Sequence, residues 1–159
     1  MRTMRHAMTR KPTPEPSKDP FMKVLRPLVE TYFALLDKGA SHIRSLGLTD
    51  SQFDVIATLG DTEGMTCKEL SEKTLVTKGT LTGVLDRLEK KDLIERVPSR
   101  EDRRSTFIRL TPKGDARFRE VFPAHIQYMK PYFERAFTAA EASKLRELLL
   151  RLKNSFEKD

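Results

Sequence analysis

The apolar residues of this 159-residue chain change their spacing near residue 94, and this change constrains the fold more than any other feature. From about Thr77 to Lys91 they recur every three or four residues, which is typical of a helix with one buried stripe. The segments Ile94 to Val97 and Thr106 to Leu110 then have the character of two short strands. Because the residues between these strands are polar and heavily charged, we predict a helix followed by a β-hairpin with a long basic tip.

Threonine marks the start of three further helices, each time with Glu or Gln three residues later. This capping-box pattern predicts a helix from Thr49 to about Gly60, a short helix from Thr66 through Lys73, and a last helix from Thr138. The chain up to about residue 91 therefore alternates short turns with helices of moderate length.

Two longer helical segments lie outside this central part. One begins at Phe21 and runs toward a stop at Gly47. The other begins at Thr111-Pro112, because proline lacks a backbone N–H and the first position of a helix does not need one. We expect this helix to be kinked or broken near Pro123 and Pro131. The resulting fold class is mainly α with a small β-hairpin wing.

The order helix, turn, short helix, turn, helix, hairpin is the order of a winged helix-turn-helix lobe, which we assign to residues 48–111. The flanking helices, residues 21–47 and 112–159, carry more apolar residues than one small lobe covers, so we expect them to form a dimerisation region. Residues 1–20 are rich in Pro and basic residues and predict a flexible arm.

The basic composition is compatible with a polyanionic partner such as nucleic acid, but it does not establish one. The formal net charge of +7 and a pI of about 9.6 suit a polyanion, although many basic proteins bind none. A single cysteine excludes an internal disulfide framework, no apolar run is long enough to span a bilayer, and the N-terminus lacks the apolar centre of a secretory signal. These features predict a cytoplasmic protein.

The helix after Thr77 carries the residues that we expect to meet DNA. Its face opposite the apolar stripe is small, hydroxylic and basic, as a helix in the major groove requires. The candidates are Thr77, Lys78, Thr80, Thr82 and Arg87, with Arg87 placed to meet a phosphate. An ordinary solvated helix face is the alternative interpretation of this helix taken alone.

The hairpin tip favours the DNA interpretation. Arg100, Arg103 and Arg104 are crowded into a few residues, and such arginines on a thin ribbon suit the negative potential of a narrow minor groove. We expect Asp102 to brace a neighbouring arginine and so to fix the tip.

At this point the sequence resembles a known family. The segment from Asp102 to Gly114 resembles the wing signature of MarR-type regulators, Asp-x-Arg followed by Val/Ile-x-Leu-Thr-x-x-Gly. The segment from Leu81 to Lys91 is similar to the recognition helix of that family, and Gly47 to Val55 and Thr138 to Glu141 resemble the starts of its second and last helices.

The resemblance implies a homodimer whose two winged lobes bind successive major grooves of a pseudo-palindromic operator, and a pocket for a small phenolic or carboxylate effector. The chain departs from the family at Asp92, where glycine is frequent, but aspartate also tolerates the left-handed conformation. It departs again at Tyr32, which occupies the place of the reactive cysteine of the peroxide-sensing branch, so that sensing mechanism does not carry over.

Several other residues have two interpretations. His42 and Arg44 are candidates for binding an anionic effector, but a solvated surface role is favoured for each. His6, His42 and His125 are scattered without ligand spacing, which argues against a metal site. We expect Cys67 to be buried or unreactive, and we hypothesise that its oxidation does not control DNA release.

The sequence therefore predicts a sequence-specific regulator of transcription that binds duplex DNA, and in particular a repressor released by a small ligand. We expect no enzyme activity and no cofactor, because the chain shows no phosphate loop, nucleophile elbow or histidine dyad at motif spacing. The alternative is a winged-helix module that contacts protein or RNA and binds no operator.

Overall fold

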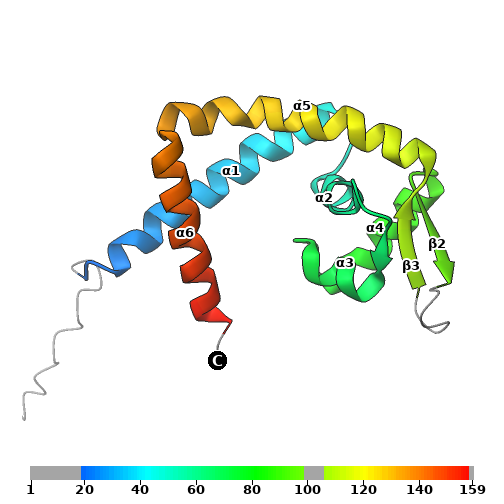
Figure 1. Ribbon diagram of the computed structural model, residues 1–159, viewed down its shortest axis with the longest axis horizontal. Helices are drawn as coiled ribbons and strands as arrows, with labels where there is room; N and C mark the ends of the chain where they lie inside the picture. The colour runs from blue at the N-terminus through cyan, green and yellow to red at the C-terminus, as the bar shows by residue number, and fades with distance from the viewer. Residues whose placement is uncertain (1–18, 99–105, 158–159) are drawn as a thin grey trace, which may run out of the picture. The chain divides into compact units, whose positions relative to one another are not determined.

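The computed structural model describes residues 19–98 and 106–157 (Figure 1). The chain divides into two compact units at Asp37, and each unit is described by itself. The described part of the first unit holds a short 3-10 helix, Met22–Val24, and the first part of helix α1, Leu25–Ser45. The predicted arm, residues 1–20, lies almost wholly outside the described residues.

The second unit begins inside α1 and contains all the remaining elements. They are α2 Asp50–Leu59, β1 Met65–Thr66, α3 Cys67–Lys73, α4 Lys78–Lys90, β2 Ile94–Pro98, β3 Thr106–Leu110, α5 Pro112–Ala136 and α6 Ala139–Phe156. This order confirms the predicted fold class, mainly α with a small β wing.

Local side-chain chemistry sets most helix starts. Each predicted capping box is present, at Thr49, Thr66 and Thr138. In each, the threonine hydroxyl accepts a hydrogen bond from the backbone N–H three residues later, and the Gln or Glu side chain at that position accepts one from the threonine backbone N–H. Between elements the backbone reverses at Gly47, with φ +74°, and at Asp92, with φ +59°. Asp92 therefore adopts the left-handed conformation, which we expected aspartate to tolerate at this position.

The small sheet has one strand more than predicted. Its order is β1-β3-β2, with both pairs antiparallel: Met65 lies opposite Ile108, and Arg96 lies opposite Ile108 on the other side. Gly64, with φ +107°, allows β1 to approach, because a Cβ there would lie 2.5 Å from the Ile108 carbonyl oxygen.

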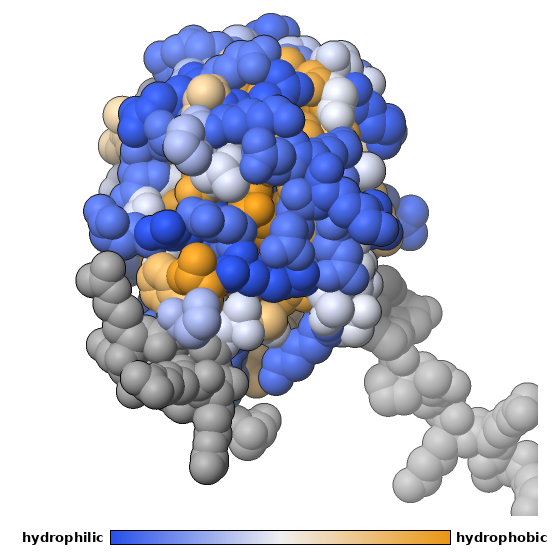
Figure 2. Space-filling view, turned by 90° about the vertical axis from the view of Figure 1, so that its right-hand side faces the viewer, coloured by the Kyte–Doolittle hydropathy of each residue, from blue (hydrophilic) through white to orange (hydrophobic). Residues whose placement is uncertain are grey.

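The core of the second unit lies where α2, α4 and the sheet meet, beneath α5 (Figure 1). Its fully buried side chains are Ile56, Leu59, Leu70, Leu85, Leu88, Ile94, Ile108, Val55, Val84 and Val121. The α5 residue Phe118 closes over α2 so tightly that a Cβ at Gly60 would lie 2.2 Å from its ring. The face that carries the wing strands is mostly hydrophilic, with apolar side chains showing between polar ones (Figure 2).

The predicted break of the long helix near its prolines is wrong, because α5 continues through both Pro123 and Pro131, and the alternative, a kink, stays a prediction. A proline in a helix deprives the carbonyl four residues earlier of its partner. Those carbonyls belong to Arg119 and Gln127, which are exposed residues, so water can satisfy them. The helix therefore tolerates both prolines.

Large apolar side chains remain exposed on the outer helices of both units. In α6, none of the residues is buried, although Leu148, Leu149, Leu152 and Phe156 are spaced as one stripe. In the first unit, the exposed large apolar residues are Phe21, Met22, Val24, Leu25, Val29, Tyr32, Phe33, Leu35 and Leu36. None of the helices in the described residues combines the length and the hydropathy that a membrane-spanning segment needs.

Candidate nucleic-acid interface

Helix α4 separates its residues into a buried face and an exposed face, as its sequence predicts. Leu81, Val84, Leu85 and Leu88 point into the core. The five candidate DNA contacts on or next to this helix are all exposed: Thr77, Lys78, Thr80, Thr82 and Arg87. The structure thus places these five side chains on one accessible helix and its N-cap.

The first turn of α4 presents little bulk. The Thr77 hydroxyl makes no capping bond and instead donates to the hydroxyl of Thr80 at 3.0 Å. A Cβ at Gly79 would meet no atom within 4 Å, so this position faces open space. A helix end lined by hydroxyls and a glycine can approach the edges of base pairs closely.

The turn that precedes α4 is anchored to α2 by Asp54. The Leu75 backbone N–H donates to the Asp54 carboxylate at 2.7 Å, and the Val76 N–H also donates to it. Burial raises the pKa of the Asp54 carboxyl, while these two hydrogen bonds act to lower it. The bonds fix where α4 begins relative to the core, and the chain pattern alone gave no sign of this anchor.

The wing is joined to the other end of α4 by ion pairs. Arg96 of β2 donates to Asp86 at 2.8 Å and to Glu89 at 2.5 Å. Burial acts to lower the pKa of Arg96, but the hydrogen bonds and charges of the two carboxylates raise it overall. On the outer face of the wing Arg109 pairs with Glu95 at 2.7 Å. These ion pairs were not predicted, although Asp86 and Glu89, three residues apart on a helix that precedes a strand arginine, were a signal for them.

The four candidate residues of the wing tip lie outside the described residues. They are Arg100, Asp102, Arg103 and Arg104. Their assignment to DNA contact and to bracing stays a prediction.

The two candidate effector residues differ in their surroundings. Arg44 is exposed, but His42 is half-buried and paired: its Nδ1 lies 3.2 Å from Nδ1 of His125, and its ring stacks on Tyr128 at 4.1 Å. The favoured solvated role is therefore wrong for His42, because α5 packs against it. His125 also meets the Phe53 ring at 4.8 Å.

The surroundings of His125 lower its pKa and so favour its neutral form. Burial lowers the pKa of His125, the neighbouring His42 lowers it further, and Asp50 acts in the opposite direction. Within the described ranges, no group of three His, Cys, Asp or Glu side chains is placed to hold a metal ion. Cys67, which the sequence predicted to be buried or unreactive, is exposed.

Comparison with known proteins gives consistent matches. The family model described as the MarR family matches residues 48–106. The chain is 33% identical over 104 residues to the HTH-type transcriptional regulator MhqR of Bacillus subtilis. This match covers 65% of this chain and 72% of MhqR.

Solved structures agree with the fold. The structure is similar to AbsC of Streptomyces coelicolor, a MarR family transcriptional regulator, with a TM-score of 0.80, 22% identity, and 89% of this chain and 97% of that chain covered. It is also similar to Sco3205 of the same organism, a MarR family regulator solved in complex with DNA, with a TM-score of 0.76, 21% identity, and 84% and 85% covered.

Proposed function

The chain belongs to the MarR family of transcriptional regulators, and from this premise we propose that it binds a pseudo-palindromic DNA operator as a homodimer and represses transcription until a small effector releases it. One observation carries the proposal. The exposed residues in the first turns of α4 are small and hydroxylic, with one lysine, and both ends of α4 are fixed to the lobe, by Asp54 at its start and by Arg96 at its end.

Rigid presentation matters because sequence is recognised by a few side chains at base edges. A major groove admits one helix, and a contact at a base edge discriminates only if the helix enters in one register. In the proposed complex the first turns of α4 meet base edges, with Thr80 and Thr82 as hydrogen-bonding side chains and Arg87 on a phosphate. The wing arginines Arg100, Arg103 and Arg104 then enter the neighbouring minor groove.

Dimerisation is supported by the uncovered apolar stripe of α6. A stripe of leucines with no buried member is unusual on a monomer, and a second copy of the chain would remove it from water. Two lobes about one DNA turn apart would bind both half-sites of an operator. The structure of Sco3205 with DNA supports duplex binding by a protein of this fold.

The proposed effector binds near the end of α1. His42 and Arg44 are its candidate contacts, for a phenol or carboxylate. His42 is the better of the two, since its half-buried imidazole already lies among aromatic rings.

Selection of bound duplexes from random DNA, followed by titration of variants on the enriched sequence, tests the proposal. We expect Thr82→Ala to cost about 1 kcal/mol or more on the operator and less on random DNA, because it removes a base-edge contact. Arg103→Ala and Arg104→Ala should weaken binding to every duplex and lower the salt slope by about one. Lys130→Ala removes an exposed cation on α5 and should bind as wild type does.

Two outcomes would contradict the proposal. Wild-type affinity in Thr82→Ala, Arg103→Ala and Arg104→Ala together would mean that DNA docks elsewhere. Preference for RNA over duplex DNA in a competition gel shift would favour the alternative, a winged-helix interaction module.

A further inference from the structure

A hollow of about 390 Å³ lies where the turn between α1 and α2, the end of α4 and the first turns of α5 meet. Four of its described lining residues are basic, Lys90, Lys91, Lys113 and Arg117, and one is acidic, Asp92. None of the described lining residues is among the candidate contacts for DNA or for the proposed effector. The proposed function therefore gives this hollow no role.

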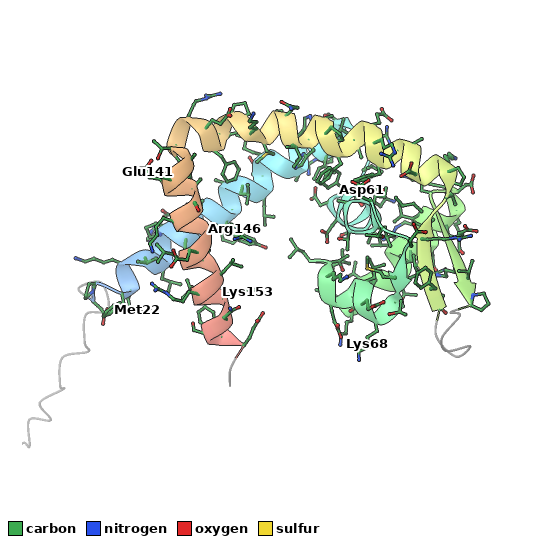
Figure 3. The ribbon with its side chains drawn as sticks, in the orientation of Figure 1. Met22, Asp61, Lys68, Glu141, Arg146 and Lys153 are labelled. Atoms are coloured by element: carbon green, nitrogen blue, oxygen red, sulfur yellow. The ribbon has the colours of Figure 1, made fainter. Side chains whose placement is uncertain are left out.

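The hollow lies at the end of α4 opposite to the one that we assign to base edges. Lys78 and Lys90 are the first and last residues of α4, and a helix of this length separates them by about 18 Å. Figure 3 shows Lys68 of α3 on the side of the lobe opposite to α5, whose first turns carry Lys113 and Arg117. The hollow thus lies away from the groove that the first turns of α4 would enter.

Three of the four cations are held in place by neutral acceptors. The Lys113 ammonium donates to the Lys91 backbone carbonyl at 2.7 Å. The Lys91 ammonium in turn donates to the Gln52 amide oxygen at 3.5 Å. The Arg117 guanidinium donates to the Leu46 backbone carbonyl. A neutral acceptor positions a cation without cancelling its charge, so these contacts fix three positive groups around one space.

The nearby carboxylates leave part of this charge uncompensated. Within the described residues, the three lysines of the hollow form no ion pair. Arg117 pairs with Glu120 at 2.6 Å, and Asp92 is the single acid among the described lining residues. Four cations and these two acids leave a net charge of +2 around the hollow. Because like charges at close range repel one another, an anion bound there would be stabilised.

The lining also indicates how much negative charge the anion carries. Leu48 and Leu93, both buried, contribute apolar walls. A cleft with walls of low dielectric and charges of one sign concentrates the electrostatic potential. A single carboxylate or phenolate would compensate half of the net charge, whereas a phosphoryl group carries about −2 and lysine ammonium groups are common phosphate ligands.

We infer that this hollow binds the phosphoryl group of a small phosphorylated molecule, with the ammonium groups of Lys90, Lys91 and Lys113 around it. Its volume is in the range of small-molecule sites, so the hollow also admits the part of the molecule that carries the phosphoryl group. The inference goes beyond the proposed function, because the site is separate from both the DNA-contacting face and His42.

Titration of inorganic pyrophosphate into the full chain without DNA tests the site, with calorimetry and the melting temperature as readouts. We expect saturable binding below about 10 mM and a melting temperature that rises with pyrophosphate, because a ligand of the folded state stabilises it. Lys90→Gln should weaken binding about tenfold, because it removes one of the charges that compensate the phosphoryl group. Lys90 is exposed and makes no printed side-chain bond, so this variant should fold as wild type does.

Lys130→Gln is the matched control. It removes an exposed lysine of α5 that pairs with Glu134 outside the hollow, and it should bind pyrophosphate as wild type does. Absence of saturable binding to the wild-type chain would refute the site. Equal affinity in Lys90→Gln and Lys130→Gln would refute it as well, because the anion would then be attracted by the overall charge of the protein.

Two further measurements test the chemical class and the source of the phosphate. Benzoate, with one negative charge, should bind at least about tenfold more weakly than pyrophosphate, and equal affinity would overturn the phosphoryl assignment. The salt slope of duplex binding should be the same in Lys90→Gln and wild type. A slope lowered by about one in Lys90→Gln would assign the hollow to a DNA backbone phosphate and overturn the inference of a free ligand.

Discussion

Replacement of Gly114 by alanine should destabilise the lobe, and the structure gives the reason in detail. Gly114 lies in the first turn of α5, where its N–H donates to the Thr111 hydroxyl at 3.0 Å. A Cβ there would lie 1.8 Å from the Leu93 carbonyl oxygen and 2.8 Å from its carbon. Both atoms belong to the main chain, which has no flexible end that can turn aside.

The size of the effect follows from that distance. A Cβ atom in a real protein almost never lies within 3.0 Å of a non-bonded heavy atom. The Leu93 carbonyl and α5 must therefore separate by at least 1.2 Å, the difference between 3.0 and 1.8 Å. Overpacking of this kind costs about 1–3 kcal/mol, and weakening the Thr111 N–H bond to the same oxygen adds about 1 kcal/mol. The higher helix propensity of alanine offsets less than about 1 kcal/mol, which leaves a net loss of about 1–4 kcal/mol.

Gly79→Ala is the matched control, since it makes the same substitution in the first turn of another helix. A Cβ at Gly79 meets nothing within 4 Å, so this variant should be as stable as wild type or up to about 1 kcal/mol more stable. Urea unfolding of the three proteins at one protomer concentration measures the difference. If Gly114→Ala and Gly79→Ala unfold within about 0.5 kcal/mol of each other, the close approach of α5 to Leu93 is refuted.

Two further predictions concern the joints around α2. Asp54→Ala should lower the free energy of unfolding by about 1–3 kcal/mol in urea titrations and weaken operator binding in gel shifts, because two backbone N–H groups lose their acceptor; unchanged operator affinity would show that this anchor does not position α4. Because the pKa of His125 is lowered below its ordinary 6.5 in the folded chain, the unfolded chain takes up its proton first, so stability should be constant above that pH and fall as pH drops from it toward the lowered pKa. His125→Gln should flatten that fall in thermal melts between pH 7 and 5, and an identical fall in both proteins would assign it to other groups.

The elements that the sequence predicts well are those whose ends are fixed locally. A capping box involves residues three apart, so Thr49, Thr66 and Thr138 identify helix starts without knowledge of the rest of the chain. Strand β1 escaped prediction because it has two residues and exists only by pairing with β3, some forty residues away. The prediction of a break in α5 was wrong for a related reason. Whether a helix tolerates a proline depends on whether the carbonyl that loses its hydrogen bond lies at the surface, which the sequence does not show.

The candidate interface divides in the same way. Helical spacing alone placed Lys78, Thr80 and Thr82 on the exposed side of α4, since the apolar stripe fixes the opposite side. The contacts that hold α4 in position are long-range ones, between Asp54 and Leu75 and between Arg96 and Asp86, and no periodicity encodes them. The histidine pair joins residues 83 positions apart and was equally hidden.

Helix α2 connects these hidden contacts into one mechanical route. Its Phe53 ring lies against His125 of α5, which pairs with His42 at the end of α1, while the next residue, Asp54, holds the turn that begins α4. If an effector at His42 shifts α2, Leu75 and the first turn of α4 should shift with it, because Asp54 holds the Leu75 backbone. We therefore predict that an effector at His42 can move Thr80 and Thr82 out of register with the base edges without contacting α4. Weakened effector release in Phe53→Leu, with operator affinity retained, is the result that this route requires.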